Sequence, residues 1–230
     1  MKAIVFDSGP VISLTVNNLL GLLTSLKERY NGCFSITDSV RKELIERPLE
    51  TKKFKFEALQ VLRCIKFDVL TVHESPRDLT IKLLDLANKA YIAKGNCVQV
   101  VHYAEMSSLA AAILNEADAF VVDERNTRLL LEEPERLAEI LSRRLHTEIK
   151  VNKKNLDELR RLAKGIRLIR SVELITVSFE MGLLDKYVVD IPNARKTLLE
   201  AVLWGVKLNG CSVSEEEIDE ILKIEINSRN

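Results

Sequence analysis

The sequence predicts an α/β protein with a central parallel sheet. Short apolar runs alternate with longer segments of helical periodicity, the pattern that strand–helix–strand units produce. Two of these runs, residues 3–6 and 119–122, end abruptly in an acid, Asp7 and Asp123. Uninterrupted apolar runs are typical of parallel strands that are buried on both faces. The two acids should therefore mark the carboxyl edge of the sheet, where open α/β sheets bind their ligands.

The individual elements follow from the same periodicities. Strands are predicted at 3–7, 33–37, 67–72, 119–123 and 147–151. Helices are predicted between them at 18–30, 38–47, 54–62, 76–93, 104–116 and 127–145. Pro76 suits the first turn of its helix, and Gly95 suits the exit from it.

Beyond residue 151 the pattern becomes helical. Helices are predicted at 156–170, 172–181, 194–208 and 214–223, and Ser214 with Glu217 forms a capping box at the start of the last one. We therefore divide the chain into a first unit at 1–151 and a helical C-terminal extension at 152–230. Because no linker or repeat separates them, we expect the extension to pack on the first unit.

Composition sets broad limits on function. The chain has 230 residues, of which 47% are apolar, enough for a substantial core. No apolar run approaches a membrane span and the first residues lack a signal-peptide pattern, so we expect a cytoplasmic protein with no membrane partner. The zero net charge argues against a bulk positive field for nucleic acid but allows local basic patches. The four dispersed cysteines lack zinc-site spacing and are interpreted as small, buried or semi-buried thiols.

Four acids stand beside apolar strands or helices and are the main clue to function. Asp7 and Asp123 follow strands, whereas Glu43 and Glu105 lie near the starts of predicted helices. Val40 and Glu43 share one helix face, so Glu43 adjoins an apolar contact. Carboxylates gathered at one site repel each other unless a cation neutralises them, and hard divalent ions such as Mg2+ or Mn2+ prefer oxygen ligands.

These four segments resemble the PIN-domain family of metal-dependent nucleases over roughly the first two thirds of the chain. The opening Val-Phe-Asp-Ser at residues 5–8 resembles the first family strand, and 36–44 resembles the motif with Val and Glu three apart. His102 to Ala110 is similar to the third motif, and Asp123 falls where the family has Thr-Asp-Asp. The sequence departs from the family at Ala104, Val122 and Glu124, which replace the usual Gly, Thr and second Asp. The segments 180–186 and 208–214 also look like a helical tail found on some members.

The resemblance implies a PIN-like three-layer fold with a central parallel sheet, and a Mg2+- or Mn2+-dependent endoribonuclease that hydrolyses RNA phosphodiester bonds. It implies catalytic roles for four acids and a neighbouring hydroxyl: Asp7, Glu43, Glu105, Asp123 and Ser8. The same four acids are the expected metal ligands, with Glu124 as a further one. A homodimer and an antitoxin or RNA-processing partner are also consistent with the resemblance.

Each acid also has a purely structural interpretation. Asp7 and Asp123 could cap the helices that follow them, and Glu105 could favour a helix N-terminus. Glu43 could be one more solvated residue of a charged helix. Asp118 precedes its strand and should lie at the opposite edge of the sheet from Asp123, so we set it aside.

Basic residues offer weaker signals. Arg125 and Arg128 could contact phosphate, although Arg128 could instead pair with Glu124 one turn away. A basic run over 160–170 places three cations at helical spacing, which fits either a nucleic-acid backbone or a solvated face: Arg160, Lys164 and Arg167. We identify no interleaved aromatic pattern for base stacking, and aromatic residues make up only 5% of the chain.

Two other functions compete with the nuclease hypothesis. One is a catalytically silent PIN-like scaffold that binds RNA or protein, and the retention of all four acids argues against it. The other is a phosphatase-like α/β hydrolase, but Gly9 stands where a phosphoaspartate enzyme has its second Asp. The absence of glycine-rich phosphate loops disfavours nucleotide triphosphates and dinucleotides.

Overall fold

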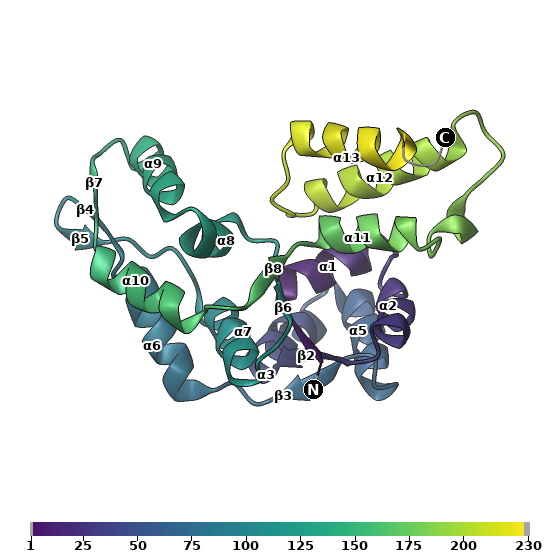
Figure 1. The fold of residues 1–230 in the computed structure, drawn as a ribbon. Coiled ribbons are helices and arrows are strands. Elements are labelled where there is room, and N and C mark those ends of the chain that lie inside the picture. The colour runs from purple at the N-terminus through teal and green to yellow at the C-terminus, as the bar shows by residue number, and fades with distance from the viewer. Residues whose placement is uncertain (1, 228–230) are drawn as a thin grey trace.

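A five-stranded parallel sheet forms the centre of the molecule. The computed structural model describes residues 2–227 (Figure 1). The strand order is β3-β2-β1-β6-β8, formed by Thr71–His73, Cys33–Thr37, Ala3–Phe6, Ala119–Val121 and Arg167–Ile169, and all neighbouring strands are parallel. The chain is therefore an α/β protein with helices flanking a parallel sheet, as the sequence predicts.

Alternating side chains of the central strands feed two separate apolar cores. Ile4 and Phe6 point into one core, whereas Val5 belongs to the other. Val121 and Phe120 divide between the cores in the same way. Because successive strand residues point to opposite faces, both faces must be covered, and this gives the three layers.

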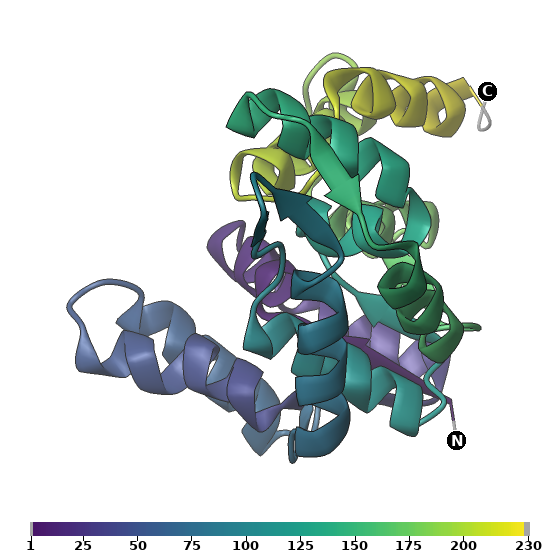
Figure 2. The same ribbon diagram turned by 90° about the vertical axis from the view of Figure 1, so that its left-hand side faces the viewer.

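Three helices contribute buried side chains to each core. The first core receives them from α1 (Ser8–Val16), α2 (Leu22–Tyr30) and α5 (Lys55–Lys66). The second core receives them from α6 (Arg77–Asn88), α7 (Tyr103–Leu114) and α10 (Lys153–Leu162). Between β2 and α5 the chain forms α3 (Asp38–Arg41), a π-helical segment η1 (Lys42–Glu46) and α4 (Arg47–Glu50). These segments and α5 project to the left in Figure 2.

The C-terminal helices pack on the α1 side of the sheet. Helix α11 (Ser171–Glu180) is followed by the 3-10 segment η2 (Asp185–Tyr187) and by α12 (Ala194–Leu208) and α13 (Glu215–Asn227). Their buried side chains, among them Val172, Leu203 and Ile218, join the first core. The predicted capping box is confirmed, because Ser214 N donates to Glu217 Oε2 at 2.8 Å and Glu217 N donates to Ser214 Oγ at 3.1 Å.

The helix predicted at 156–170 is wrong in its second half. Helix α10 ends at Leu162, and Gly165 adopts a φ of +97°, which turns the chain into β8. Glycine adopts such angles without the steric cost of a Cβ. Strand β8 is the fifth strand of the central sheet, so the segment beyond residue 151 is not wholly helical.

Other predicted boundaries also need correction. The helix predicted at 76–93 ends at Asn88, and Gly95 lies instead in the turn between β4 (Tyr91–Ala93) and β5 (Asn96–Cys97). Strand β7 (Ile149–Val151) pairs antiparallel with β4 in a separate three-stranded sheet of order β5-β4-β7. The helix predicted at 127–145 is two helices, α8 (Arg125–Glu132) and α9 (Pro134–Leu145), because Pro134 begins a new helix.

The strand predicted at 67–72 occupies only 71–73, and helix α1 was not assigned from the sequence.

Among residues 2–227, no helix is long and apolar enough to cross a membrane.

Candidate functional site

Asp7 lies at the carboxyl end of β1 and is buried, with only 4% of its surface exposed. Its backbone N–H donates to the carbonyl of Val121 at 2.9 Å and so extends the β1–β6 pairing. The Oδ1 atom is buried without a hydrogen-bond partner among the described residues. A buried polar atom in this state is costly, and such atoms gather where a ligand or ion is to bind.

The surroundings of Asp7 favour its protonated form. Burial first, and then the charges of Glu105 and Glu43, raise the pKa of Asp7 to about 7, while the backbone amides of Ser8 and Gly9 partly oppose the shift. The main cause is the loss of hydration that an ionised carboxylate needs. A nearby cation would reverse this balance and hold the carboxylate ionised.

Glu105 joins the same acidic group from the first turn of α7. Burial raises the pKa of Glu105, Glu124 adds a repulsive charge, and Thr127 opposes the shift by donating its hydroxyl to Oε2 at 2.6 Å. The Thr127 hydroxyl also fixes the orientation of the carboxylate. Glu124 itself is exposed just before α8, so its charge reaches the group from the solvent side.

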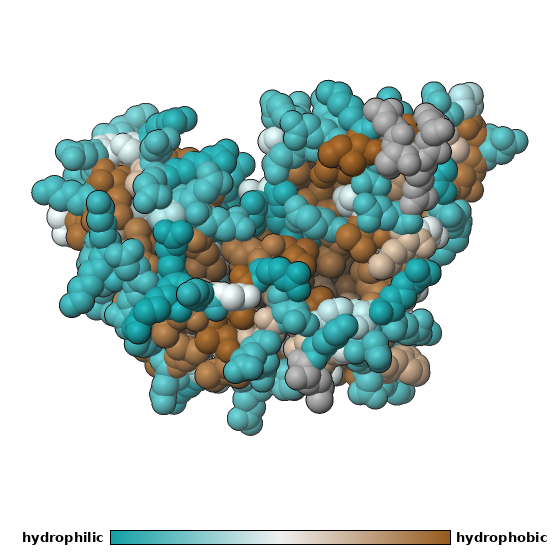
Figure 3. Space-filling view, in the orientation of Figure 1, coloured by the Kyte–Doolittle hydropathy of each residue, from teal (hydrophilic) through white to brown (hydrophobic). Residues whose placement is uncertain are grey.

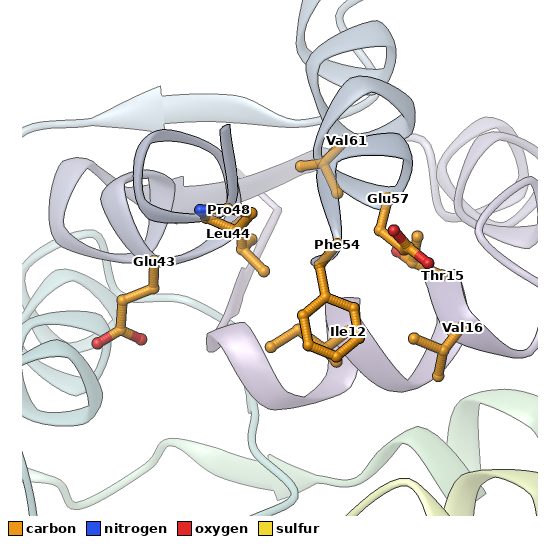
Figure 4. A pocket seen from close by; sticks show the side chains of 9 residues that line it. All are labelled: Ile12, Thr15, Val16, Glu43, Leu44, Pro48, Phe54, Glu57 and Val61. Carbon is orange, nitrogen blue, oxygen red and sulfur yellow. The ribbon is translucent and has the colours of Figure 1, made fainter. Parts of the chain in front are cut away.

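Glu43 approaches from the π-helical segment η1 and is half-buried. Its Oε1 lies 3.6 Å from Nη1 of Arg47, an ion pair with an exposed partner that holds it weakly. In Figure 4 its carboxylate points away from the apolar side chains around it. Single π-helical turns are frequent at functional sites, and Glu43 lies in such a segment.

Asp123 occupies the corresponding position after β6 but has a different environment. Its Oδ1 accepts a hydrogen bond from Ser171 N at 2.7 Å, and its Oδ2 accepts from Ser171 Oγ at 2.8 Å and from Ser13 Oγ at 3.1 Å. It therefore joins β6 to α11 and α1. The loop after α12 covers it, because Ser212 N donates to the Asp123 carbonyl at 3.1 Å.

Gly9 shows how close the two strand-end acids come. A Cβ built on Gly9 would lie 3.9 Å from Oδ2 of Asp7 and 3.6 Å from Cβ of Asp123. The charges of Glu105 and Glu43 act on Asp7, and that of Glu124 acts on Glu105, whereas the carboxylate oxygens of nearby Asp123 accept three hydrogen bonds. Ser8, at the start of α1, is half-buried next to Asp7.

Asp118 lies at the opposite edge of the sheet, as its position before β6 predicts. Its backbone N–H donates to the carbonyl of Ala3 at 2.8 Å, and its carboxylate accepts a hydrogen bond from the Tyr30 hydroxyl.

The arginines after Asp123 serve the C-terminal loop. Arg125 Nε donates to Ser212 Oγ at 3.3 Å, and Arg128 Nη1 donates to the Ser212 carbonyl at 3.1 Å. Arg128 pairs with Glu132 rather than with Glu124. Both arginines line a hollow of about 420 Å3 that opens between α8–α9 and the α12–α13 loop, visible as the notch at the top of Figure 3.

The three cations of the basic run do not share a helix, which corrects their predicted helical spacing. Arg160 lies on α10, Lys164 in the turn after it and Arg167 on β8. They nevertheless line one hollow of about 680 Å3 beside the edge strand β8, together with Glu132.

Two groups near the acids were missed from the sequence. Thr37, the last residue of β2, shares hydrogen bonds with Ser39 at 2.8 Å and with Ser107 of α7 at 2.9 Å. Three hydroxyls at the end of a strand and on a facing helix were the available signal. The other group is the segment 52–56, Lys-Lys-Phe-Lys-Phe, whose aromatic and basic residues are all exposed. This is an interleaved pattern of the kind that the sequence analysis did not identify.

The donor set fits one kind of metal site better than others. Within the described part of the chain, no three His, Cys, Asp or Glu side chains converge closely enough to hold a metal ion. Mg2+ commonly uses one or two carboxylates and completes its shell with water and substrate phosphate, and the unpartnered, buried Oδ1 of Asp7 suits that arrangement.

Comparison with known proteins adds no relative to this picture. No protein-family model matches the chain, and neither the curated proteins nor the solved structures contain a significant match.

Proposed function

We propose that the protein is a PIN-like endoribonuclease that uses Mg2+ or Mn2+ at an acidic site centred on Asp7. The observation that carries the proposal is the buried, unpartnered Oδ1 of Asp7 beside the charges of Glu105 and Glu43. Burying a carboxylate that protein donors compensate only in part opposes folding, so the arrangement calls for a functional explanation. A divalent cation supplies the missing compensation.

The residues divide the work as follows. Asp7 would hold the cation, and Glu105, which Thr127 orients through a hydrogen bond, would support it. Glu43 and Glu124 add negative charge from two sides of the site. When bound, the cation lowers the pKa of a water molecule and stabilises charge on the scissile phosphate. Asp123, whose oxygens already accept three hydrogen bonds, positions α1 and α11 around the site.

Ser8 is placed to orient a water molecule or a phosphate oxygen next to Asp7. RNA, rather than DNA, is proposed from the motif resemblance. A cytoplasmic role, a homodimer and an antitoxin or RNA-processing partner stay predictions.

A catalytically silent scaffold is the second candidate, and two observations favour it. The two oxygens of Asp123 are occupied by protein donors, and the described residues hold no cluster of three metal-ligating side chains. In that case the protein binds RNA or another protein without cleaving it, and the acids affect only its stability.

The test is RNA cleavage by the purified protein in Mg2+ or Mn2+, with and without EDTA. Asp7→Asn should lower cleavage by about 10³-fold, because several kcal/mol of metal-dependent stabilisation disappear and each tenfold is about 1.36 kcal/mol. Asp118→Asn is the matched control, since this acid lies at the opposite edge of the sheet. Equal cleavage by wild type and Asp7→Asn would reject the site, whereas RNA that is bound but never cut would favour the scaffold.

A further inference from the structure

A small apolar cavity lies directly beside the acidic site. It has a volume of about 130 Å3, and its walls are Ile12 and Val16 of α1, Leu44 and Pro48, and Val61 of α5. Phe54 stands at its mouth, and Glu43 and Glu57 are its charged residues (Figure 4). Ligand sites for drug-sized molecules measure about 300–1,000 Å3, so this cavity suits a single planar ring system.

Phe54 is held in an unusual way. It adopts a φ of +65°, in the left-handed region that bulky residues rarely enter, and 46% of its surface is exposed. A glycine at this position before α5 would avoid the steric cost. Figure 4 shows the ring lying over Ile12 at the cavity mouth, so the strained backbone presents an aromatic face there. Strain of this kind is a feature of ligand-binding segments.

The charge around the cavity mouth selects among apolar ligands. Lys53 Nζ lies 4.7 Å from the Phe54 ring centroid, and Lys52 and Lys55 are exposed on either side in sequence. Three lysines beside an aromatic ring add nothing to the affinity for an uncharged, purely apolar peptide or lipid chain. Single-stranded nucleic acid gains from both, because bases stack on aromatic rings while lysines neutralise phosphates.

The cavity also shares a residue with the proposed active site. Glu43 lines the cavity and is one of the acids of the proposed site. In Figure 4 its carboxylate points away from the apolar walls of the cavity. A ring held in the cavity therefore lies next to an acid of that site.

We propose that this cavity binds one unstacked base of a single-stranded RNA, with the base stacked on Phe54 and the adjoining phosphates on Lys52, Lys53 and Lys55. The inference rests on the proposed nuclease function, since it assigns the base next to the cleaved bond. It makes the acidic site selective for single strands, because a base in a duplex is paired and stacked.

Glu57 gives the cavity a preference among bases. Its carboxylate lies at the cavity beside Thr15 in Figure 4, and a carboxylate only accepts hydrogen bonds. The exocyclic amino groups of adenine, cytosine and guanine can donate to it, whereas uracil carries no amino group and offers only its ring N3–H. Bases with an amino group should bind more tightly than uracil, and Glu57→Gln should reduce that difference.

The test separates base binding from catalysis by using an Asp7→Asn background without divalent ions. Fluorescence anisotropy with a labelled single-stranded hexaribonucleotide should give a Kd at least about 5-fold weaker for Phe54→Leu, because stacking on an aromatic ring is lost. Phe54→Tyr should restore binding. Phe67→Leu is the matched control: Phe67 stands at the other end of α5, is 63% exposed, and has Arg63 5.6 Å from its ring.

Two further measurements locate the base and the phosphates. In a series of hexamers, each with one abasic position, only one position should weaken binding when its base is missing. The wild-type protein should cleave the strand next to that position. Replacing Lys52, Lys53 and Lys55 by Gln should reduce the slope of log K against log salt by about 0.7 for each phosphate contact.

The outcomes distinguish the two proposals. If Phe54→Leu binds RNA as wild type does and no abasic register matters, the cavity is not a base site, even where Asp7-dependent cleavage is intact. If Phe54 controls binding but no RNA is cut in any metal, the base site stands and the nuclease proposal fails. Binding of an apolar peptide in place of RNA, with Phe54→Leu as good as wild type, also overturns the inference.

Discussion

Asp7 and Asp123 follow neighbouring parallel strands at the same edge of the sheet, yet their environments are opposites. Both are almost completely buried, at 4% and 2% exposed. Asp123 accepts three hydrogen bonds from Ser13 and Ser171, which join α1 and α11 to the sheet. Asp7 has an oxygen without a partner and two acidic neighbours. The same sequence pattern thus produced one acid that stabilises the fold and one that opposes it.

Burial alone therefore does not identify a functional acid. What matters is whether protein donors compensate the charge, because a compensated carboxylate contributes to stability and an uncompensated one remains available for a ligand. Measuring the free energy of unfolding and the ionisation of each acid separately tests this contrast.

The largest expected effect is a pH dependence caused by Asp7. Its folded pKa is raised from 3.8 to about 7, so between pH 4 and pH 7 the folded state binds more protons than the unfolded state, and stability falls as pH rises through that window. The loss is about 4 kcal/mol, at about 1.36 kcal/mol per pKa unit. Glu105, whose pKa is also raised, acts in the same direction. Urea unfolding from pH 4 to pH 8 measures this slope.

Asp7→Asn should flatten most of that slope, because the amide carries no charge at any pH in the window. Added Mg2+ should stabilise the wild-type protein at pH 8 and leave Asp7→Asn unchanged. A wild-type slope of opposite sign, with stability gained from pH 4 to pH 7, would contradict the assigned environment of Asp7.

A smaller effect is expected when Asp123 is removed. Asp123→Ala leaves the Ser171 amide and two hydroxyls buried without their acceptor, and should lower the free energy of unfolding by about 3 kcal/mol or more at pH 7. Asp7→Asn, measured in parallel, should cost less than about 1 kcal/mol or stabilise the protein, since it removes an uncompensated charge. If both variants lose the same stability, the contrast between the two acids fails.

The smallest effect concerns a single hydrogen bond to Asp123. Ser13→Ala removes the 3.1 Å donor from α1 but leaves both contacts from Ser171, so it should cost about 1 kcal/mol in the same unfolding assay. Ser13→Ala combined with Asp123→Ala should cost little more than Asp123→Ala alone, because both changes delete the same interaction. Fully additive losses would show that Ser13 stabilises α1 by another route.

The sequence predicted the central sheet well because buried parallel strands leave a direct signal. The runs before Asp7 and Asp123 are apolar without interruption, and β1, β2 and β6 form where expected. Strand β8 was missed because its Arg167 and Ile169 continue an apparent helical period from α10, and only Gly165 marks the break. Strands β4 and β5 are shorter than the window over which periodicity can be judged.

The candidate site was predicted in part for a similar reason. The positions of Asp7 and Asp123 at one edge follow from strand direction, but the donors that distinguish them do not. Ser171 is 48 residues from Asp123, and Ser13 is 110 residues away, so only the folded chain shows these contacts. Glu124, exposed beside Glu105, could be named from its adjacency to Asp123, whereas the role of Thr127 depends on the packing of α8 against α7.

A titration of the Asp7 carboxyl group is the most direct test of the environment assigned to it. Carbon-13 NMR of the aspartate carboxyls, with the Asp7 signal assigned from its absence in Asp7→Asn, gives its titration curve. The account predicts a midpoint near pH 7 in EDTA that moves to lower pH in Mg2+ or Mn2+, because a bound cation compensates the buried charge. A midpoint near pH 4 that does not respond to either metal would contradict the central claim.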